Sequence, residues 1–120
     1  MTDIVRTVKR DRRPLTPAEF EVLLALADGD KHGYAILKAV ARGSDGVVLG
    51  PATLYTIIRR FLASGFIAES AQRPDPALDD ERRRYYRITT YGESVAREEA
   101  RRLTQLVKLA RASGFARGHA

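Results

Sequence analysis

The stretch PATLYTIIRRFLASG, residues 51–65, decides the fold. Pro51 suits the first position of a helix, where its missing N–H is not needed, and Gly65 suits the left-handed residue that ends one. The apolar residues between them recur at helical spacing and form one stripe: Leu54, Ile57, Ile58, Phe61 and Leu62. The opposite side carries small, polar and basic residues: Thr53, Thr56, Arg59, Arg60 and Ala63. The pattern predicts a helix that packs by its stripe and leaves this polar side exposed.

Two shorter helices are predicted before this segment. Thr16 and Glu19 have the spacing of a capping box around Pro17, while Leu15 and Phe20 stand at the positions of a hydrophobic staple. This first helix should run to about residue 27. Its expected apolar face comprises Phe20, Leu23, Leu24 and Ala27.

The second helix should open at His32-Gly33-Tyr34, with His32 as a cap or exposed to solvent, and close at Arg42-Gly43. One side of it would carry Tyr34, Leu37, Val40 and Ala41. A glycine-rich loop over residues 43–50 then leads to Pro51.

Two short strands are predicted after Gly65. Residues 66–70 are apolar and residues 83–89 are aromatic and β-branched, which is typical of strands. Residues 72–82 between them carry two prolines and mixed charge, as expected for a loop. Successive strand residues point to opposite faces, so one of Tyr85 and Tyr86 should lie in the core.

Three helices followed by a hairpin predict a mainly α (α+β) fold, a winged helix-turn-helix with a two-stranded wing. The third helix would pack on the first two and present its polar side to the major groove of DNA. Its N-terminus favours a phosphate near Ala52 and Thr53. The candidate DNA-binding residues on this helix are Ala52, Thr53, Tyr55, Thr56, Arg59 and Arg60. Because Arg59 and Arg60 diverge by about 100° on a helix, only one of them need face the duplex.

The wing would add Arg73, Arg82, Arg83 and Arg84, which could reach the flanking backbone or the minor groove. The alternative is that the acidic run Asp79–Glu81 balances Arg82–Arg84.

A long helix is predicted from Thr90, which forms a second capping box with Glu93, to about Ala112. At roughly 33 Å it is too long for the small helical core to cover, so its apolar stripe predicts a homodimer. The expected dimer-interface residues are Val95, Ala96, Leu103, Leu106, Val107 and Ala110.

The chain thus divides into four expected parts. These are a flexible basic arm (1–14), a winged-helix DNA-binding domain (15–89), a C-terminal dimerisation helix (90–113) and a disordered tail (114–120). The arm carries five basic and two acidic residues, and could follow nucleic acid or simply remain solvated.

Composition excludes several classes of protein. The 120 residues include no cysteine, which rules out disulfides and thiolate metal sites. The sequence shows no membrane span, no signal peptide, no catalytic grouping and no cofactor or metal site, so we expect a cytoplasmic protein that is not an enzyme. A net charge of +6 favours a polyanionic partner.

Four motifs, in this order and spacing, resemble the PadR family of bacterial transcriptional regulators. They are His32-Gly33-Tyr34-Ala35-Ile36, Ala52-Thr53-Leu54-Tyr55, Leu62-Ala63-Ser64-Gly65-Phe66-Ile67, and Arg84-Tyr85-Tyr86-Arg87-Ile88-Thr89-Thr90-Tyr91-Gly92. The resemblance implies a dimeric repressor that binds operator DNA and is released by a small-molecule effector. It also implies that Tyr34, Thr53, Tyr55 and the wing arginines lie toward DNA, although packing is the alternative role for Tyr34.

The sequence departs from the family pattern at three positions. Ala52 replaces a usual Gly or Ser, Thr56 a usual Pro, and Ala35 a common Glu. These changes bear on the details of DNA contact. The rival functions are a winged helix that binds protein and a coat that binds nucleic acid without sequence preference. The polar, basic outer side of the third helix argues against the first, and side-chain readout by that helix argues against the second.

Overall fold

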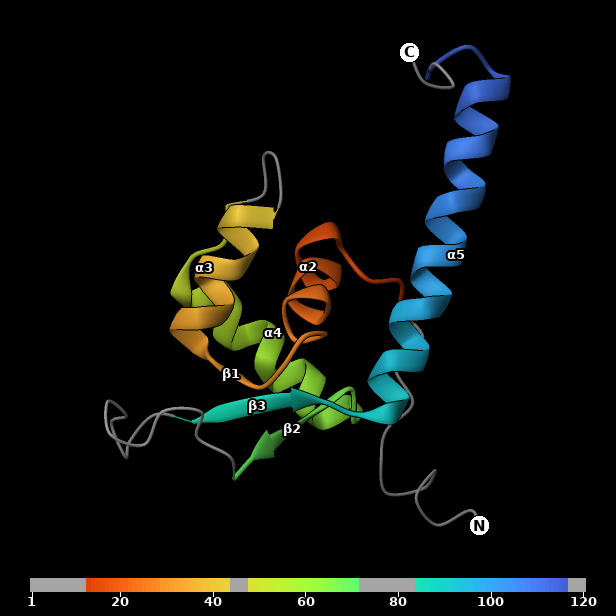
Figure 1. Ribbon diagram of the computed structural model, residues 1–120. Coiled ribbons are helices and arrows are strands. Elements are labelled where there is room, and N and C mark those ends of the chain that lie inside the picture. The colour runs from red at the N-terminus through yellow and green to blue at the C-terminus, as the bar shows by residue number, and fades with distance from the viewer. Residues whose placement is uncertain (1–12, 44–47, 72–83, 117–120) are drawn as a thin grey trace, which may run out of the picture.

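Three short helices, a small sheet and one long helix make up the computed structural model, which describes residues 13–43, 48–71 and 84–116 (Figure 1). In chain order the elements are α2 (Pro17–Ala25), β1 (Lys31–His32), α3 (Gly33–Gly43), α4 (Pro51–Ser64), β2 (Ile67–Ser70), β3 (Tyr85–Ile88) and α5 (Thr90–Ala112). The predicted order of three helices, hairpin and long helix is confirmed.

Helix α4 begins and ends at the predicted residues. Pro51 occupies its first turn, and Gly65 ends it with a φ of 80°, in the left-handed region that favours glycine. Its buried residues are Leu54, Ile57, Ile58, Phe61 and Ser64. Leu62, expected in the stripe, is 36% exposed because it lies at the edge of the stripe rather than over the core.

The buried sides of α2 and α3 agree only in part with those predicted, since Phe20, Leu23, Leu37 and Val40 do pack in or against the core. In α2 the core takes Val22 and Leu23, whereas Leu24 is half exposed. In α3 it takes Ile36 and Val40, whereas Tyr34 is exposed. Both helices offer more apolar residues than the core can cover, so packing against α4 and the sheet, not hydropathy alone, sets which side turns inward. The expected members Ala27 and Ala41 are likewise exposed.

The sheet has three strands in the order β1-β3-β2, all antiparallel. The short strand β1, which the sequence did not predict, pairs Lys31 with Tyr86 and His32 with Tyr85. Consequently Tyr85 and Tyr86 are both buried, where only one was expected. Tyr86 joins the main core, and the ring of His32 stands edge-on to that of Tyr85 at 5.2 Å. His32 also caps α3, as expected, because its Nδ1 accepts a hydrogen bond from the Ala35 N–H.

Helix α5 packs on α2 and β3 near its start and then extends past the helical body (Figure 1). Its cap is Thr89, not the predicted Thr90. The Thr89 hydroxyl accepts from the Gly92 N–H at 2.9 Å and contacts the carbonyl oxygens of Gly65 and Phe66, which fix it at the end of α4.

None of the helices in the described ranges is long and apolar enough to cross a membrane.

Candidate nucleic-acid interface

The outer side of α4 is exposed and polar, as the sequence predicted. Its apolar stripe is held in the core, which turns the predicted contact residues outward. The exposed residues on this side are Ala52, Thr53, Tyr55, Thr56 and Arg59. The helix is therefore free to offer these side chains to a partner.

The first turn of α4 adds backbone donors to this surface. Its N-cap is Gly50, which provides no side-chain hydrogen bond, and Pro51 has no N–H. The N–H groups of Ala52 and Thr53 can therefore point at an anion, and the helix dipole favours one there. The Thr56 hydroxyl donates to the Ala52 carbonyl at 3.2 Å, so Thr53 and Tyr55 are the better hydroxyl contacts in this turn.

Arg60 does not belong to this surface, contrary to its prediction as a DNA-binding residue. Its Nη1 lies 2.5 Å from Glu19 Oε1, and Nη2 donates to the carbonyl of Arg13 at 3.3 Å. The guanidinium also lies over the rings of Phe61 and Phe66, at 5.9 and 6.0 Å. With its side chain only 12% exposed, Arg60 joins α4 to α2, and Arg59 is the arginine that faces outward.

The start of α3 lies beside this side of α4. A Cβ built on Gly33 would be 3.6 Å from Leu54 Cδ2 and 3.7 Å from the Tyr55 hydroxyl. Tyr34, the next residue, is 63% exposed and so is a surface residue rather than a packed one. Lys38 places its Nζ 5.3 Å above the Tyr34 ring. Lys38 is not among the residues predicted from the sequence, although its position four residues after Tyr34 on a helix indicates that the two side chains are neighbours.

The wing is described only at its base. Arg84, just before β3, is exposed and pairs at 2.8 Å with Glu69 of β2, which is not part of the acidic run expected to balance the wing arginines. Arg73, Arg82 and Arg83 lie outside the described residues, as does the acidic run beside them. Burial, reinforced by the negative charge of Glu69, raises the pKa of the Tyr86 hydroxyl, which therefore remains protonated at the base of the wing.

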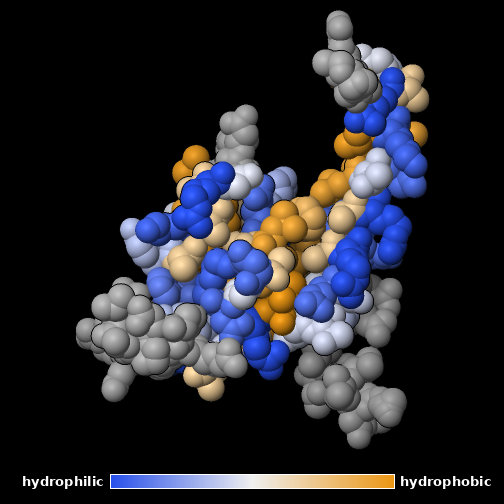
Figure 2. Space-filling view, viewed as in Figure 1, coloured by the Kyte–Doolittle hydropathy of each residue, from blue (hydrophilic) through white to orange (hydrophobic). Residues whose placement is uncertain are grey.

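The predicted dimer stripe of α5 separates into two parts. Val95 and Ala96 are partly buried against the core of their own subunit, so less of their surface is left for a dimer interface. Further along, Leu106, Val107 and Leu109 are exposed, while Leu103 and Ala110 are partly covered. Figure 2 shows hydrophobic surface along the side of α5 that faces the helical body. No other described segment packs over Leu106, Val107 and Leu109.

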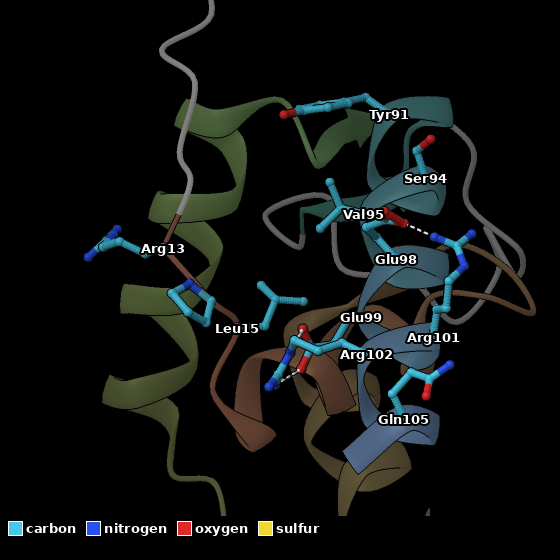
Figure 3. Close-up of a pocket in the computed structure, with 11 residues that line it drawn as sticks. Arg13, Leu15, Tyr91, Ser94, Val95, Glu98, Glu99, Arg101, Arg102 and Gln105 are labelled. Atoms are coloured by element: carbon cyan, nitrogen blue, oxygen red, sulfur yellow. Dashed lines mark hydrogen bonds and ion pairs between the residues drawn. The ribbon is translucent and has the colours of Figure 1, made fainter. Parts of the chain in front are cut away.

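A groove of about 740 Å³ lies where residues 13–15 pass the first half of α5 (Figure 3). Tyr91 stands near one end and Gln105 near the other, and Glu99 and Arg102 point toward Leu15. Arg102 donates to both Glu99 oxygens, at 3.1 and 2.5 Å, which raises the pKa of its guanidinium. The groove thus combines apolar walls with an ion pair, Glu99–Arg102, whose two charged groups bind each other.

The described ranges contain no cluster of three or more His, Asp or Glu side chains that could hold a metal ion. Most of the predicted arm, residues 1–12, lies outside these ranges.

Comparison with known proteins identifies the family. Residues 22–98, the span from α2 through the first turns of α5, match the Transcriptional regulator PadR-like family. The chain belongs to this family. Members of this family are transcriptional regulators, and PadR regulators as a group bind DNA.

Solved structures agree with the winged-helix fold. A PadR family transcription regulator from Clostridium difficile is 20% identical with a TM-score of 0.67, covering 81% of this chain and 97% of that chain. A transcriptional regulator from Clostridium thermocellum is 23% identical with a TM-score of 0.65, covering 93% and 95%. BpsR of Bordetella bronchiseptica, whose DNA binding is regulated by 6-hydroxynicotinic acid, is 24% identical with a TM-score of 0.61, covering 90% and 67%.

A sequence relative is an uncharacterised 37.1 kDa protein in a transposon of Streptomyces fradiae, 36% identical over 89 residues. Those residues are 74% of this chain, which spans about a quarter (24%) of that relative.

Proposed function

We propose that this PadR-like protein is a homodimeric, sequence-specific repressor that a small-molecule effector releases from its operator. The observation that carries the DNA-binding part is the amphipathic division of α4. Its stripe is locked in the core, while Thr53, Tyr55 and Arg59 stand exposed on the other side. Residues 15–89 would form the DNA-binding domain, and residues 90–113 the dimerisation helix.

Each part of the surface has a role in this proposal. Thr53, Tyr55 and the first-turn N–H groups of α4 bind phosphates, and Arg59 reads a base edge in the major groove. Tyr34, which is exposed and follows Gly33, would add a contact at the edge of this surface. Arg84 reaches the flanking backbone once it leaves Glu69, and the sequence adds Arg73, Arg82 and Arg83 to the wing.

The dimer and the effector rest on α5. The exposed residues Leu106, Val107 and Leu109 give a second copy an apolar contact. The groove beside α5 is within the usual range of small-molecule sites, roughly 300–1,000 Å³, so it supports a ligand there. BpsR, with the same fold, is regulated by a small aromatic acid.

Selection of bound duplexes from random DNA tests the proposal. A homodimer should recover a palindrome with half-sites about one helical turn apart. Arg59→Gln should then weaken binding by about 1–3 kcal/mol for each half-site and relax the preference at one position of each. Recovery of no shared sequence, with equal binding to all duplexes, would contradict sequence-specific repression.

A further inference from the structure

Lys38 and Tyr34 form a pair on the exposed side of α3. They are four residues apart on one helix, and the Lys38 ammonium lies 5.3 Å above the centre of the Tyr34 ring. Both side chains are exposed, so neither contributes to the core. An exposed cation held over an aromatic face is attracted to it only weakly, so the pair explains how Lys38 is oriented but adds little stability.

This pair borders the surface proposed to bind DNA. The backbone of Gly33 lies close to the Tyr55 hydroxyl, and Tyr34 follows directly. Lys38 follows one turn later on α3, with its ammonium over the Tyr34 ring. No carboxylate in the described ranges forms an ion pair with Lys38, unlike Lys31, which pairs with Asp28, and Arg84, which pairs with Glu69. The ammonium is thus available to an anion from outside the subunit.

We propose that Lys38, positioned by the ring of Tyr34, binds a backbone phosphate of the DNA duplex. The proposal rests on the proposed function, since it needs a duplex against α4. Lysine acts as a compact point charge on a flexible stem, which suits a phosphate better than the paired acceptors of a base edge. The Tyr34 ring restricts the aliphatic part of the Lys38 side chain and leaves the three N–H donors of the ammonium group unoccupied. Lys38 therefore loses less conformational entropy when it binds a phosphate.

A phosphate contact has a distinct signature. It strengthens binding to every duplex alike and releases one counterion, so its loss lowers the salt dependence of affinity without changing sequence preference. We therefore expect Lys38→Gln to weaken binding to the selected operator and to a scrambled duplex by the same factor. A homodimer carries Lys38 twice, so the slope of log affinity against log salt should decrease in magnitude by about 1.8, roughly 0.9 for each lost phosphate contact.

The role of Tyr34 is tested by a double-mutant cycle. Tyr34→Phe keeps the ring and should retain the Lys38 contribution, whereas Tyr34→Ala should lose part of it. In a Lys38→Gln background Tyr34→Ala should then cost little more. Equal losses in Tyr34→Phe and Tyr34→Ala would assign the effect to the hydroxyl and overturn the positioning role.

The experiment is fluorescence anisotropy with the full chain over about 50–200 mM salt. Lys108→Gln, an exposed lysine on α5, is the matched control for general charge loss. Circular dichroism melts verify that each variant is folded. An unchanged slope in Lys38→Gln, while Arg59→Gln still weakens binding, would overturn the phosphate contact and leave the proposed function standing. Failure of the wild-type chain to prefer any selected duplex would overturn the proposed function itself.

Discussion

At Gly92 an added methyl group would occupy space that the chain already fills. A Cβ there would lie 2.0 Å from the Phe66 carbonyl oxygen and 2.9 Å from Ile88 Cγ1. The obstacle is backbone, so no side-chain rotation relieves it. We expect Gly92→Ala to lower the free energy of unfolding by at least about 2 kcal/mol, measured by urea denaturation.

Gly43 provides the matched control at the end of α3. A Cβ there meets nothing within 4 Å, and alanine favours the helical state, so Gly43→Ala should be neutral or slightly stabilising. Equal stability of the two variants would show that α5 does not approach Phe66 as closely as described.

Tyr86, a buried residue, makes the stability of the protein depend on pH in the alkaline range. Burial raises its pKa above the ordinary value of 10.0, so the folded protein keeps a proton that the unfolded chain releases. Above about pH 10 the unfolded state therefore binds fewer protons, and the free energy of unfolding falls by up to about 1.4 kcal/mol per pH unit for this group. Below that pH both states are protonated and the stability is unaffected.

Tyr86→Phe should remove the part of the alkaline fall in the free energy of unfolding that comes from Tyr86. The measurement is urea unfolding on either side of about pH 10. Tyr34→Phe, at a residue 63% exposed, should decline as the wild type does. A Tyr86→Phe protein that loses as much stability at high pH as the wild type would refute the assignment.

At the scale of elements, the sequence predicted where helices begin and end better than it predicted which side of each helix is buried. Pro51 and Gly65 fix α4 through local geometry alone, and a local rule can be read from sequence. The phase of a helix depends on its neighbours instead. Tyr34 and Leu24 fit an apolar periodicity but are exposed, because α4 and the sheet cover other sides of α3 and α2.

The same dependence separates Arg59 from Arg60. The sequence placed both on the outer side of α4, but Glu19, already engaged in the α2 capping box, attracts Arg60 inward. The strand β1 was missed for a related reason. Its two residues become a strand only by pairing with Tyr85 and Tyr86, more than fifty residues away along the chain.

Arg60→Gln should therefore weaken the fold rather than the DNA contact. Removing the guanidinium leaves the Glu19 carboxylate, whose side chain is 13% exposed, without this partner. We expect a loss of about 1–3 kcal/mol in the free energy of unfolding, with the affinity of the folded protein for DNA nearly unchanged. Arg59→Gln should instead weaken DNA binding and leave the free energy of unfolding nearly unchanged. Denaturation measures the stability of the two variants, and fluorescence anisotropy measures their affinity for DNA. A weaker operator complex from a stably folded Arg60→Gln protein would return Arg60 to the DNA-binding surface.

At the scale of the whole molecule, the long helix was predictable and its division was not. The bounds Thr90–Ala112 follow from periodicity, but a periodic stripe does not show where the subunit's own core stops. The structure locates that point, since Val95 and Ala96 pack inward while Leu106, Val107 and Leu109 stay exposed. The dimer proposal therefore depends on the second half of α5 alone.

Leu106→Asp combined with Leu109→Asp should give monomers, because charged side chains would have to be desolvated in the apolar contact. Light scattering measures the mass, and each protomer should remain folded because neither leucine is in its core. Thr104→Asp introduces the same side chain at an exposed polar position about 200° around the helix from Leu106, and should leave the dimer intact. The monomer can engage only one half-site at a time, so its affinity for a palindrome should fall by about 10²–10⁴-fold, toward that of a single half-site. A double variant that keeps the mass of a dimer would move the interface away from this half of α5.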